Sequence, residues 1–341
     1  MKNITKVGLS ALAGSLVMVS ANAVDYSISG GLQTVYSTQD SPTSTEATNG
    51  KGLTTQTDLS FNASGELDNG FTVSSFMFLD TGGNVSNTSA QMTFGMGSLG
   101  TLQINNRYGS KANAIDDVTP HAYNETWDGL APTAMNHSSF GSRTIHGSLD
   151  YRIPTQELMG VTVNASITMD PSADESTEVK GGVSTTSVSG TAYTLQLAHE
   201  SGLEIGGGIE SVDDDAGIVE GQGTEAATGY IKFSAGGLTA AYQETYTNSR
   251  NGTGTEGADV EEEVYGIAFT QGDVTVSYAE GSKANKASSN TAAPIKKESE
   301  SLQVAYTMGA MTIAAAMSES TGEVAATDKY EENTLSFNFA F

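Results

Sequence analysis

The sequence has 341 residues, no cysteine, and 40 Asp plus Glu against 15 Lys plus Arg, which gives a formal net charge of −25. Such an acidic chain is unsuited to nucleic acid, whose binding needs clustered lysine and arginine. The absence of cysteine excludes a disulfide framework, and 39 glycines favour many short strands and turns.

The first 23 residues have the three parts of a secretory signal peptide. Lys2 and Lys6 form a basic start, an apolar run covers residues 7–19, and Ala21-Asn22-Ala23 has the small-residue pattern of a cleavage site. The apolar run is shorter than the ~20 residues that a membrane-spanning helix needs. We expect residues 1–23 to be removed after export and residues 24–341 to form one domain.

A two-residue alternation of apolar and polar side chains recurs from residue 25 to the end of the chain. In residues 161–169, valine, alanine, isoleucine and methionine alternate with threonine, asparagine and serine. The same period occurs at residues 194–197, 231–234 and 335–341. A period of two is typical of strands with one apolar face, whereas a helix repeats every ~3.6 residues. This pattern predicts a single all-β domain.

The connections between these stretches alternate in length. Seven are short, at residues 68–70, 97–100, 154–160, 201–202, 236–237, 271–273 and 308–310. Eight are long and polar, near residues 37–52, 80–88, 108–138, 170–190, 212–225, 247–261, 280–297 and 318–330. Together they join sixteen strands, and short turns on one side with long loops on the other are typical of a bacterial outer-membrane barrel. The alternative is a soluble two-sheet sandwich, which needs no such rhythm.

In a membrane barrel the apolar face meets lipid and the polar face lines an aqueous lumen, because hydrocarbon excludes unpaired backbone groups. Eight tyrosines share the parity of the apolar faces, and most lie toward strand ends, where aromatic girdles occur. They are Tyr26, Tyr36, Tyr151, Tyr193, Tyr242, Tyr265, Tyr278 and Tyr306.

Four stretches, residues 25–32, 66–71, 100–108 and 335–341, resemble parts of the general, non-specific porins of the Gram-negative outer membrane. The start at residues 25–32 is similar to a porin first strand, and residues 66–71 to the periplasmic turn that follows the family's second strand. Residues 100–108 resemble the strand that leads into the porin third loop. The last strand, residues 335–341, resembles the porin end with its terminal phenylalanine, Phe341.

This resemblance implies a 16-stranded antiparallel transmembrane β-barrel in the outer membrane, with the third loop folded inward. The matching segment, residues 109–138, is the longest connection in the chain. The resemblance further implies a homotrimer, with residues 80–88 as a candidate subunit latch, and Phe341 as a signal for assembly. Outer-membrane lipids and lipopolysaccharide would surround the barrel.

The third loop carries the residues that we expect to line a pore constriction. If it lies inside the barrel, its carboxylates face the narrowest water, and Arg107, with the parity of Gln103 and Asn105, projects into the lumen near its root. The alternative is that they are ordinary solvated loop acids. The predicted constriction consists of Arg107, Lys111, Asp116, Asp117, Glu125 and Asp128.

Elsewhere the lumen is expected to be mainly acidic. Strand parity places Arg152 and Lys232 inside, against Asp58, Asp150, Glu204 and Glu210. The pore should therefore prefer cations. A channel tuned to one class of solute should show a basic or aromatic ladder along the lumen, and the pattern indicates neither.

The sequence therefore predicts a porin for passive diffusion of ions and small hydrophilic solutes, with no enzyme activity. The four histidines lack a metal-ligand spacing or a nucleophile motif, so no catalytic, cofactor or metal site is expected. The acidic runs at residues 213–215 and 261–263 suit loosely bound Ca²⁺ or Mg²⁺ at the outer loops. The alternative function is a plugged or narrow barrel that binds a surface partner or is purely structural.

Overall fold

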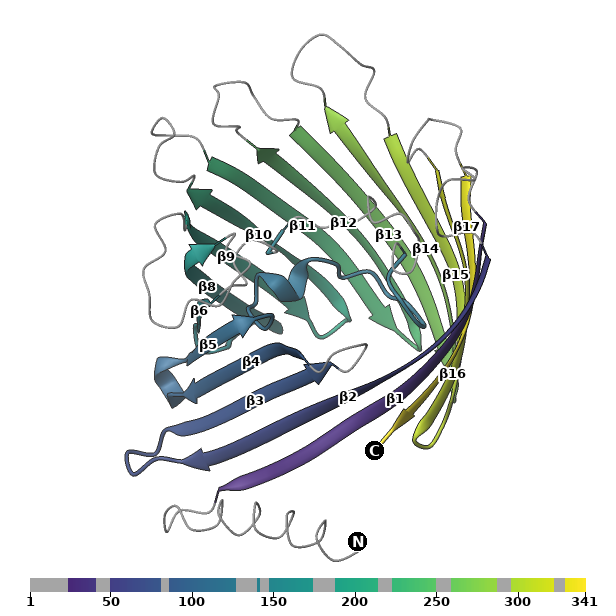
Figure 1. The fold of residues 1–341 in the computed structure, drawn as a ribbon. Helices are drawn as coiled ribbons and strands as arrows, with labels where there is room; N and C mark the ends of the chain where they lie inside the picture. The colour runs from purple at the N-terminus through teal and green to yellow at the C-terminus, as the bar shows by residue number, and fades with distance from the viewer. Residues whose placement is uncertain are drawn as a thin grey trace, which may run out of the picture.

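The computed structural model describes residues 24–40, 50–80, 86–126, 140–141, 147–173, 188–213, 223–249, 259–286, 296–321 and 329–341. They form one closed antiparallel sheet (Figure 1). The strands are β1 (Asp25–Asp40), β2 (Gly50–Glu66), β3 (Thr72–Asp80), β4 (Ser86–Gly95), β5 (Thr101–Arg107), β6 (Leu149–Arg152), β7 (Gln156–Leu158), β8 (Val161–Ala173), β9 (Val188–His199), β10 (Leu203–Asp213), β11 (Gly223–Ala235), β12 (Leu238–Ser249), β13 (Asp259–Gln271), β14 (Val274–Lys286), β15 (Lys296–Met308), β16 (Met311–Thr321) and β17 (Lys329–Ala340).

Helices are minor in this fold. Two single-turn 3-10 helices, η1 (Gly97–Leu99) and η2 (Asn113–Ile115), lie outside the sheet. Within the residues just given, no helix is long and apolar enough to cross a membrane.

The seventeen strand segments occupy sixteen positions around the barrel. β6 and β7 both pair with β8, so they are two parts of one interrupted strand. Pro154 lies between them, and proline has no N–H to donate to a ladder. The predicted sixteen-stranded barrel is confirmed. The expected connection at residues 154–160 is shorter, because β7 occupies part of it.

The barrel closes where β1 pairs with both β2 and β17. The Gly30 N–H donates to the Phe341 carbonyl (2.8 Å), and the Phe341 N–H donates to the Gly30 carbonyl (2.9 Å). A Cβ at Gly30 would lie 2.9 Å from the Phe341 ring, so the glycine lets the ring lie against the strand. Closure leaves no unpaired edge, which a barrel in hydrocarbon requires.

The short connections between strands lie at one end of the barrel. The short turns gather at the lower end in Figure 1, where β1 begins and the chain ends. The turns after β9 and β11 use Gly202 and Gly237, with φ of 90° and 85°. Residues with a Cβ rarely adopt such angles, so glycine fixes these tight reversals. The predicted short connections at residues 201–202 and 236–237 are therefore true hairpin turns.

Outward and inward side chains differ as the alternation predicts. Along β12, Leu238, Tyr242 and Tyr246 are at least 36% exposed, whereas Gln243 and Thr245 are at most 2% exposed. Apolar side chains thus cover the outside and polar ones the inside, the reverse of a soluble protein and the arrangement of a barrel in lipid. The eight predicted girdle tyrosines all lie on the outward face by register.

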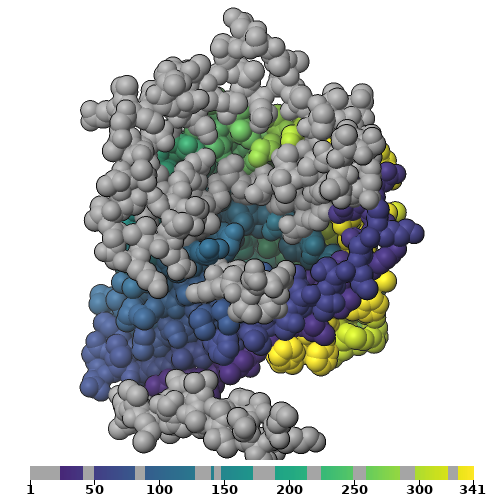
Figure 2. Space-filling view, in the orientation of Figure 1, coloured from purple at the N-terminus to yellow at the C-terminus, as the bar shows by residue number. Residues whose placement is uncertain are grey.

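The described part of the connection between β5 and β6 lies within the barrel. Figure 1 shows this part, which begins at Tyr108 and contains η2, running along the inner side of the strands from β9 to β14. Figure 2 shows the hollow between the front strands and the green strands behind, with blue-teal atoms inside it. Residues 108–126 of this connection therefore occupy part of the passage.

Candidate functional site: the passage through the barrel

The root of the third connection is held against β4, β5 and β6. Arg107 ends β5 with a φ of 68°, a left-handed conformation that turns the chain out of the strand. The Gly109 carbonyl accepts hydrogen bonds from Gln103 Nε2 (2.9 Å) and Arg152 Nη2 (3.0 Å). The Tyr108 carbonyl accepts one from Gln91 Nε2 (3.1 Å). Inward-facing side chains therefore fix the point where the chain enters the lumen.

The next part of the connection packs on small residues of the wall. Ala112, Ile115 and Phe140 form a buried cluster with residues of β9 and β11. A Cβ at Gly208 of β10 would lie 2.5 Å from Phe140 Cζ, so the missing side chain makes room for the ring. The remaining cluster members are Ala192, Ala226 and Tyr230.

Two polar side chains then hold the backbone of the connection along the wall. Gln243 of β12 accepts from the Val118 N–H (2.9 Å) and donates to the Ile115 carbonyl (2.8 Å). The Ala122 N–H donates to Ser277 Oγ of β14 (2.8 Å). Such bonds satisfy backbone groups that the connection cannot pair internally.

The far end of the described segment reaches β15 and β1. Gln303 Oε1 accepts from the Tyr123 N–H (2.8 Å) and the Asn124 N–H (3.2 Å). Gln33 Nε2 of β1 donates to the Tyr123 hydroxyl (3.4 Å). We call the inward faces of β9 to β15 the covered wall, because the third connection lies on them. The inward faces of β2 and β3, about half the circumference away from β11 and β12, form the open wall.

Five of the six predicted constriction residues lie along the described part of this segment. Arg107 and Lys111 are at its root, and the Lys111 N–H donates to Asp150 Oδ2 (3.3 Å). Asp116 and Asp117 follow η2. Glu125 lies near the end that Gln303 holds, and Asp128 lies outside the described residues.

Two of these carboxylates also shape the segment. Asp116 Oδ1 accepts from the Asp117 N–H (2.8 Å), and Asp117 Oδ1 accepts from the Thr119 N–H (2.7 Å). Such local bonds are typical of aspartate in turns. Whether Asp116 and Asp117 shape the turn or line the passage, their negative charges lie inside the barrel.

Several basic side chains of the wall are matched by acids. Arg152 Nε lies 2.6 Å from Asp150 Oδ2, and Lys283 Nζ lies 2.8 Å from Glu262 Oε1. Lys232 pairs in register with Glu204. Further inward acids are Asp58, which pairs in register with Asp80, and Glu210, which accepts a hydrogen bond from the Gly141 N–H (2.9 Å). The described lumen is therefore acidic on balance.

A family profile described as Gram-negative porin matches residues 8–341. The chain belongs to the Gram-negative porin family. The family match and the closed barrel fold together identify an outer-membrane channel protein. No curated protein matches the sequence significantly.

Solved porin structures share the fold of this porin at low sequence identity. OmpF of Salmonella typhi, in a complex with daunomycin, has a TM-score of 0.65 and 11% identity over 94% of this chain and 98% of its own. OmpT of Vibrio cholerae, in its trimer form, has a TM-score of 0.62 and 8% identity over 94% of this chain and 100% of its own. Its variant lacking loop L8 has a TM-score of 0.65 and 9% identity, with 94% and 100% covered.

The open wall of this porin holds a feature that parity reasoning missed. Phe76, Phe78 and Asp80 of β3 pair in register with Asn62, Ser60 and Asp58 of β2, which lie on the same face as Gln33 of β1. Because Gln33 reaches the third connection, this face looks into the lumen. β3 places these two phenylalanines inside, while Ser75 and Met77 point outward.

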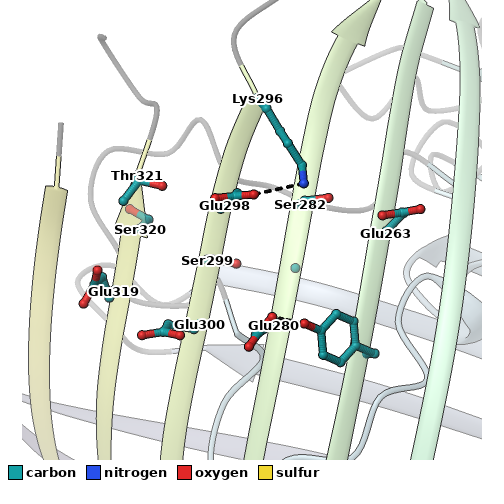
Figure 3. Close-up of a pocket in the computed structure, with 12 residues that line it drawn as sticks. Glu263, Glu280, Ser282, Lys296, Glu298, Ser299, Glu300, Glu319, Ser320 and Thr321 are labelled. Carbon is teal, nitrogen blue, oxygen red and sulfur yellow. Dashed lines mark hydrogen bonds and ion pairs between the residues drawn. The ribbon is translucent and has the colours of Figure 1, made fainter. Parts of the chain in front are cut away.

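On the outside, carboxylates lie above the tyrosine row at the upper ends of β13 to β16. Figure 3 shows Glu263, Glu280, Glu298, Glu300 and Glu319 around a hollow of about 300 Å³. The Tyr278 hydroxyl donates to Glu300 (2.9 Å), and Lys296 donates to Glu298 (2.9 Å). Lys296 is the first residue of β15. The acidic run at residues 261–263 lies near the start of β13, beside an outer connection.

Proposed function

We propose that this porin is a water-filled, cation-preferring channel for passive diffusion of ions and small hydrophilic solutes across the outer membrane. The observation that carries the proposal is the acidic lumen between the third connection and the open wall. Carboxylates within a Debye length, ~10 Å at 0.1 M salt, raise the local concentration of cations and lower that of anions. Asp116, Asp117 and Glu125 on one side and Asp58 and Asp80 on the other supply that charge.

The residues Arg107, Lys111, Asp116, Asp117, Glu125 and Asp128 are proposed as the constriction. Support comes from the hydrogen bonds that hold residues 109–124 against the covered wall, since a fixed loop keeps its charges at a fixed place in the bore. No catalytic step is part of the proposal. His199, for example, accepts from the Ser201 N–H (3.1 Å) within a periplasmic turn.

The test is single-channel recording of the purified protein in a planar bilayer with a KCl gradient. Stable ohmic openings and a reversal potential toward that of K⁺ are the expected result. A closed or very narrow barrel would contradict the channel and favour the surface-binding alternative. Open channels without preference for K⁺ would contradict only the selectivity.

Assembly and export are also proposals. A homotrimer is supported by the trimer form of the similar Vibrio cholerae OmpT, and the latch at residues 80–88 by resemblance alone. Removal of residues 1–23 as a signal peptide rests on their pattern. The native mass in mild detergent tests the trimer, and the N-terminal sequence of the exported protein tests the cleavage.

Loose Ca²⁺ or Mg²⁺ at the outer surface completes the proposal. The outward carboxylates of Figure 3 support it, because they lie where lipopolysaccharide phosphates surround an outer-membrane barrel. Among the described residues no group of three or more metal-ligating side chains is gathered as a coordination site. Any divalent ion would therefore bridge protein and lipid. Chelation by EDTA should release lipopolysaccharide from the purified protein without closing the channel.

A further inference from the structure

The root of the third connection borders a hollow that carries two basic side chains. The hollow has a volume of about 370 Å³ and lies toward the periplasmic end of the barrel, because the turn residues Gly97 and Gly100 line part of it. Lys111 of the connection and Arg152 of β6 also line it, and none of the described residues around it is acidic. The polar side chains of its lining are otherwise Thr101, Thr155, Asn164, Thr194 and Gln196.

The register of the strands places this hollow inside the lumen. Thr101 pairs with Arg152, and Arg152 pairs with Ser166, so these side chains lie on one face of the sheet. Gln103, two residues after Thr101 on the same strand, donates to the Gly109 carbonyl of the third connection. Because the connection lies within the barrel, this face is the inward one. The hollow therefore belongs to the wall of the passage, on the periplasmic side of the connection.

The wall holds the guanidinium of Arg152 in a fixed place. Its Nε lies 2.6 Å from Oδ2 of Asp150, a fully buried carboxylate, and its Nη2 donates to the Gly109 carbonyl (3.0 Å). These contacts leave further N–H groups of the guanidinium for a ligand. Asp150 offsets part of the positive charge, but it does not line the hollow itself.

Lys111 adds a positive charge that is not offset in this way. Its backbone N–H donates to Asp150 Oδ2 (3.3 Å), which holds the residue at the root of the connection. Within the described part of the chain, its ammonium group makes no hydrogen bond and no ion pair. In a partly enclosed space, opposite charges attract each other more strongly than in bulk water. Lys111 and Arg152 together therefore favour a negatively charged group in the hollow.

We propose that this hollow binds the carboxylate of small zwitterionic solutes, which carry an ammonium group as well. A carboxylate accepts hydrogen bonds from the guanidinium of Arg152 and from the ammonium of Lys111. The ammonium group of the solute is compatible with a lumen that is acidic on balance, whereas a simple anion is repelled there. The inference rests on the proposed function, because the solute enters a water-filled passage. It adds a solute class that cation preference alone does not predict.

The probe is 4-aminobutyrate, and its binding is measured by saturation-transfer NMR on the purified protein in detergent. This measurement needs no ionic current, so it is separate from the test of the channel. The parent protein should bind the probe in a saturable manner. The methyl ester of 4-aminobutyrate keeps the ammonium group and lacks the negative charge, so its binding should not need Lys111.

Three single variants test the role of Lys111. Lys111→Gln should raise the Kd for 4-aminobutyrate about fivefold or more, because a charge-assisted hydrogen bond is lost, while the Kd for the ester should stay the same or fall. Lys111→Arg keeps the charge, and its Kd should remain within about twofold of the parent value. The matched control is Lys232→Gln, because Lys232 also has an inward position but pairs in register with Glu204 outside the hollow. The Kd of this control should equal that of the parent.

Equal increases in Kd from Lys111→Gln and Lys232→Gln would overturn the inference, because the overall charge of the lumen would then attract the carboxylate. A parent protein that does not bind 4-aminobutyrate would overturn it as well, while the KCl recordings that test the proposed function are unaffected. A parent protein that binds the probe through Lys111 but forms no open channel would support the site and contradict the proposed function. Heat-modifiable gel mobility shows that each variant is folded, so a loss of binding cannot be attributed to unfolding.

Discussion

The covered wall and the open wall are built from different residues because they face different neighbours. The covered wall meets protein, and it presents small side chains such as Ala192 and Gly208, with Gln243, Ser277 and Gln303 to bond the backbone of the loop. In the open wall, Phe76 borders a hollow of about 390 Å³, and the wall carries bulky and charged side chains. The comparison shows that the strands contacted by the described part of the third connection present small and neutral side chains at the contacts, whereas β2 and β3 present larger and charged ones.

The largest effect is expected where the barrel closes between β1 and β17. Deletion of Phe341 removes both backbone hydrogen bonds to Gly30, at about 1 kcal/mol each, and its apolar side chain. The amount of folded barrel in the outer membrane should fall about tenfold or more, measured by heat-modifiable gel mobility of membrane fractions. Phe341→Leu keeps the backbone bonds and should lose less. Normal levels of the deletion variant would contradict a role for Phe341 in assembly.

Detaching the loop from the covered wall should have the next largest effect. Gln243→Leu with Gln303→Leu removes several bonds to the loop backbone, at about 1 kcal/mol each. Single-channel recordings should show a higher mean conductance and more open-channel noise. The control is Gln196→Leu, which loses a bond to the Tyr230 hydroxyl on the wall but none to the loop backbone. Identical traces from the two would mean that these glutamines do not hold the loop.

Charge on either side of the passage should contribute comparably to selectivity. Asp116→Asn with Asp117→Asn, and separately Asp58→Asn with Asp80→Asn, should each lower the K⁺/Cl⁻ permeability ratio about twofold or more in 0.1 M salt. Reversal potentials measure the change. Glu298→Gln with Glu300→Gln is the matched control, because these acids face outward and solvent screens them. A control shift as large as the others would place the filter elsewhere.

The smallest effect is expected from a single neutral anchor of the loop. Ser277→Ala removes the acceptor for the Ala122 N–H and should cost about 1 kcal/mol locally. Because Gln243 and Gln303 still hold the loop on either side, conductance should stay within the spread of parent channels. A large rise in conductance would show that the loop is less firmly fixed than its other bonds indicate.

Strand count and facing followed from the sequence because they depend on local period and turn chemistry. The alternation at residues 161–169 predicts the outward Ile167, and glycines such as Gly202 mark true turns. The sequence does not predict which side chains face the lumen where a strand lacks a clear alternation of apolar and polar residues. In β3, residues 76–79 are all apolar, so the sequence does not show which phenylalanines face the lumen.

The site was predictable only in outline. The acids of the third connection could be named from resemblance, but their long-range partners could not. Gln243 and Gln303 lie more than 100 residues away from the backbone groups that they bond, and an inward glutamine looks like any other lumen residue in sequence. Only the closed fold brings them together.

The loop is tied to β12, β14 and β15 by amide and hydroxyl groups, which carry no net charge and do not titrate in the physiological range. Neither acid nor salt acts on these ties directly. The carboxylates proposed to select ions, in contrast, lose their charge at low pH and their reach at high ionic strength. Along β12 to β15 the position of the loop is thereby independent of acid and salt, whereas at its root, where Asp150 accepts a hydrogen bond from the Lys111 N–H, the loop depends on a carboxylate.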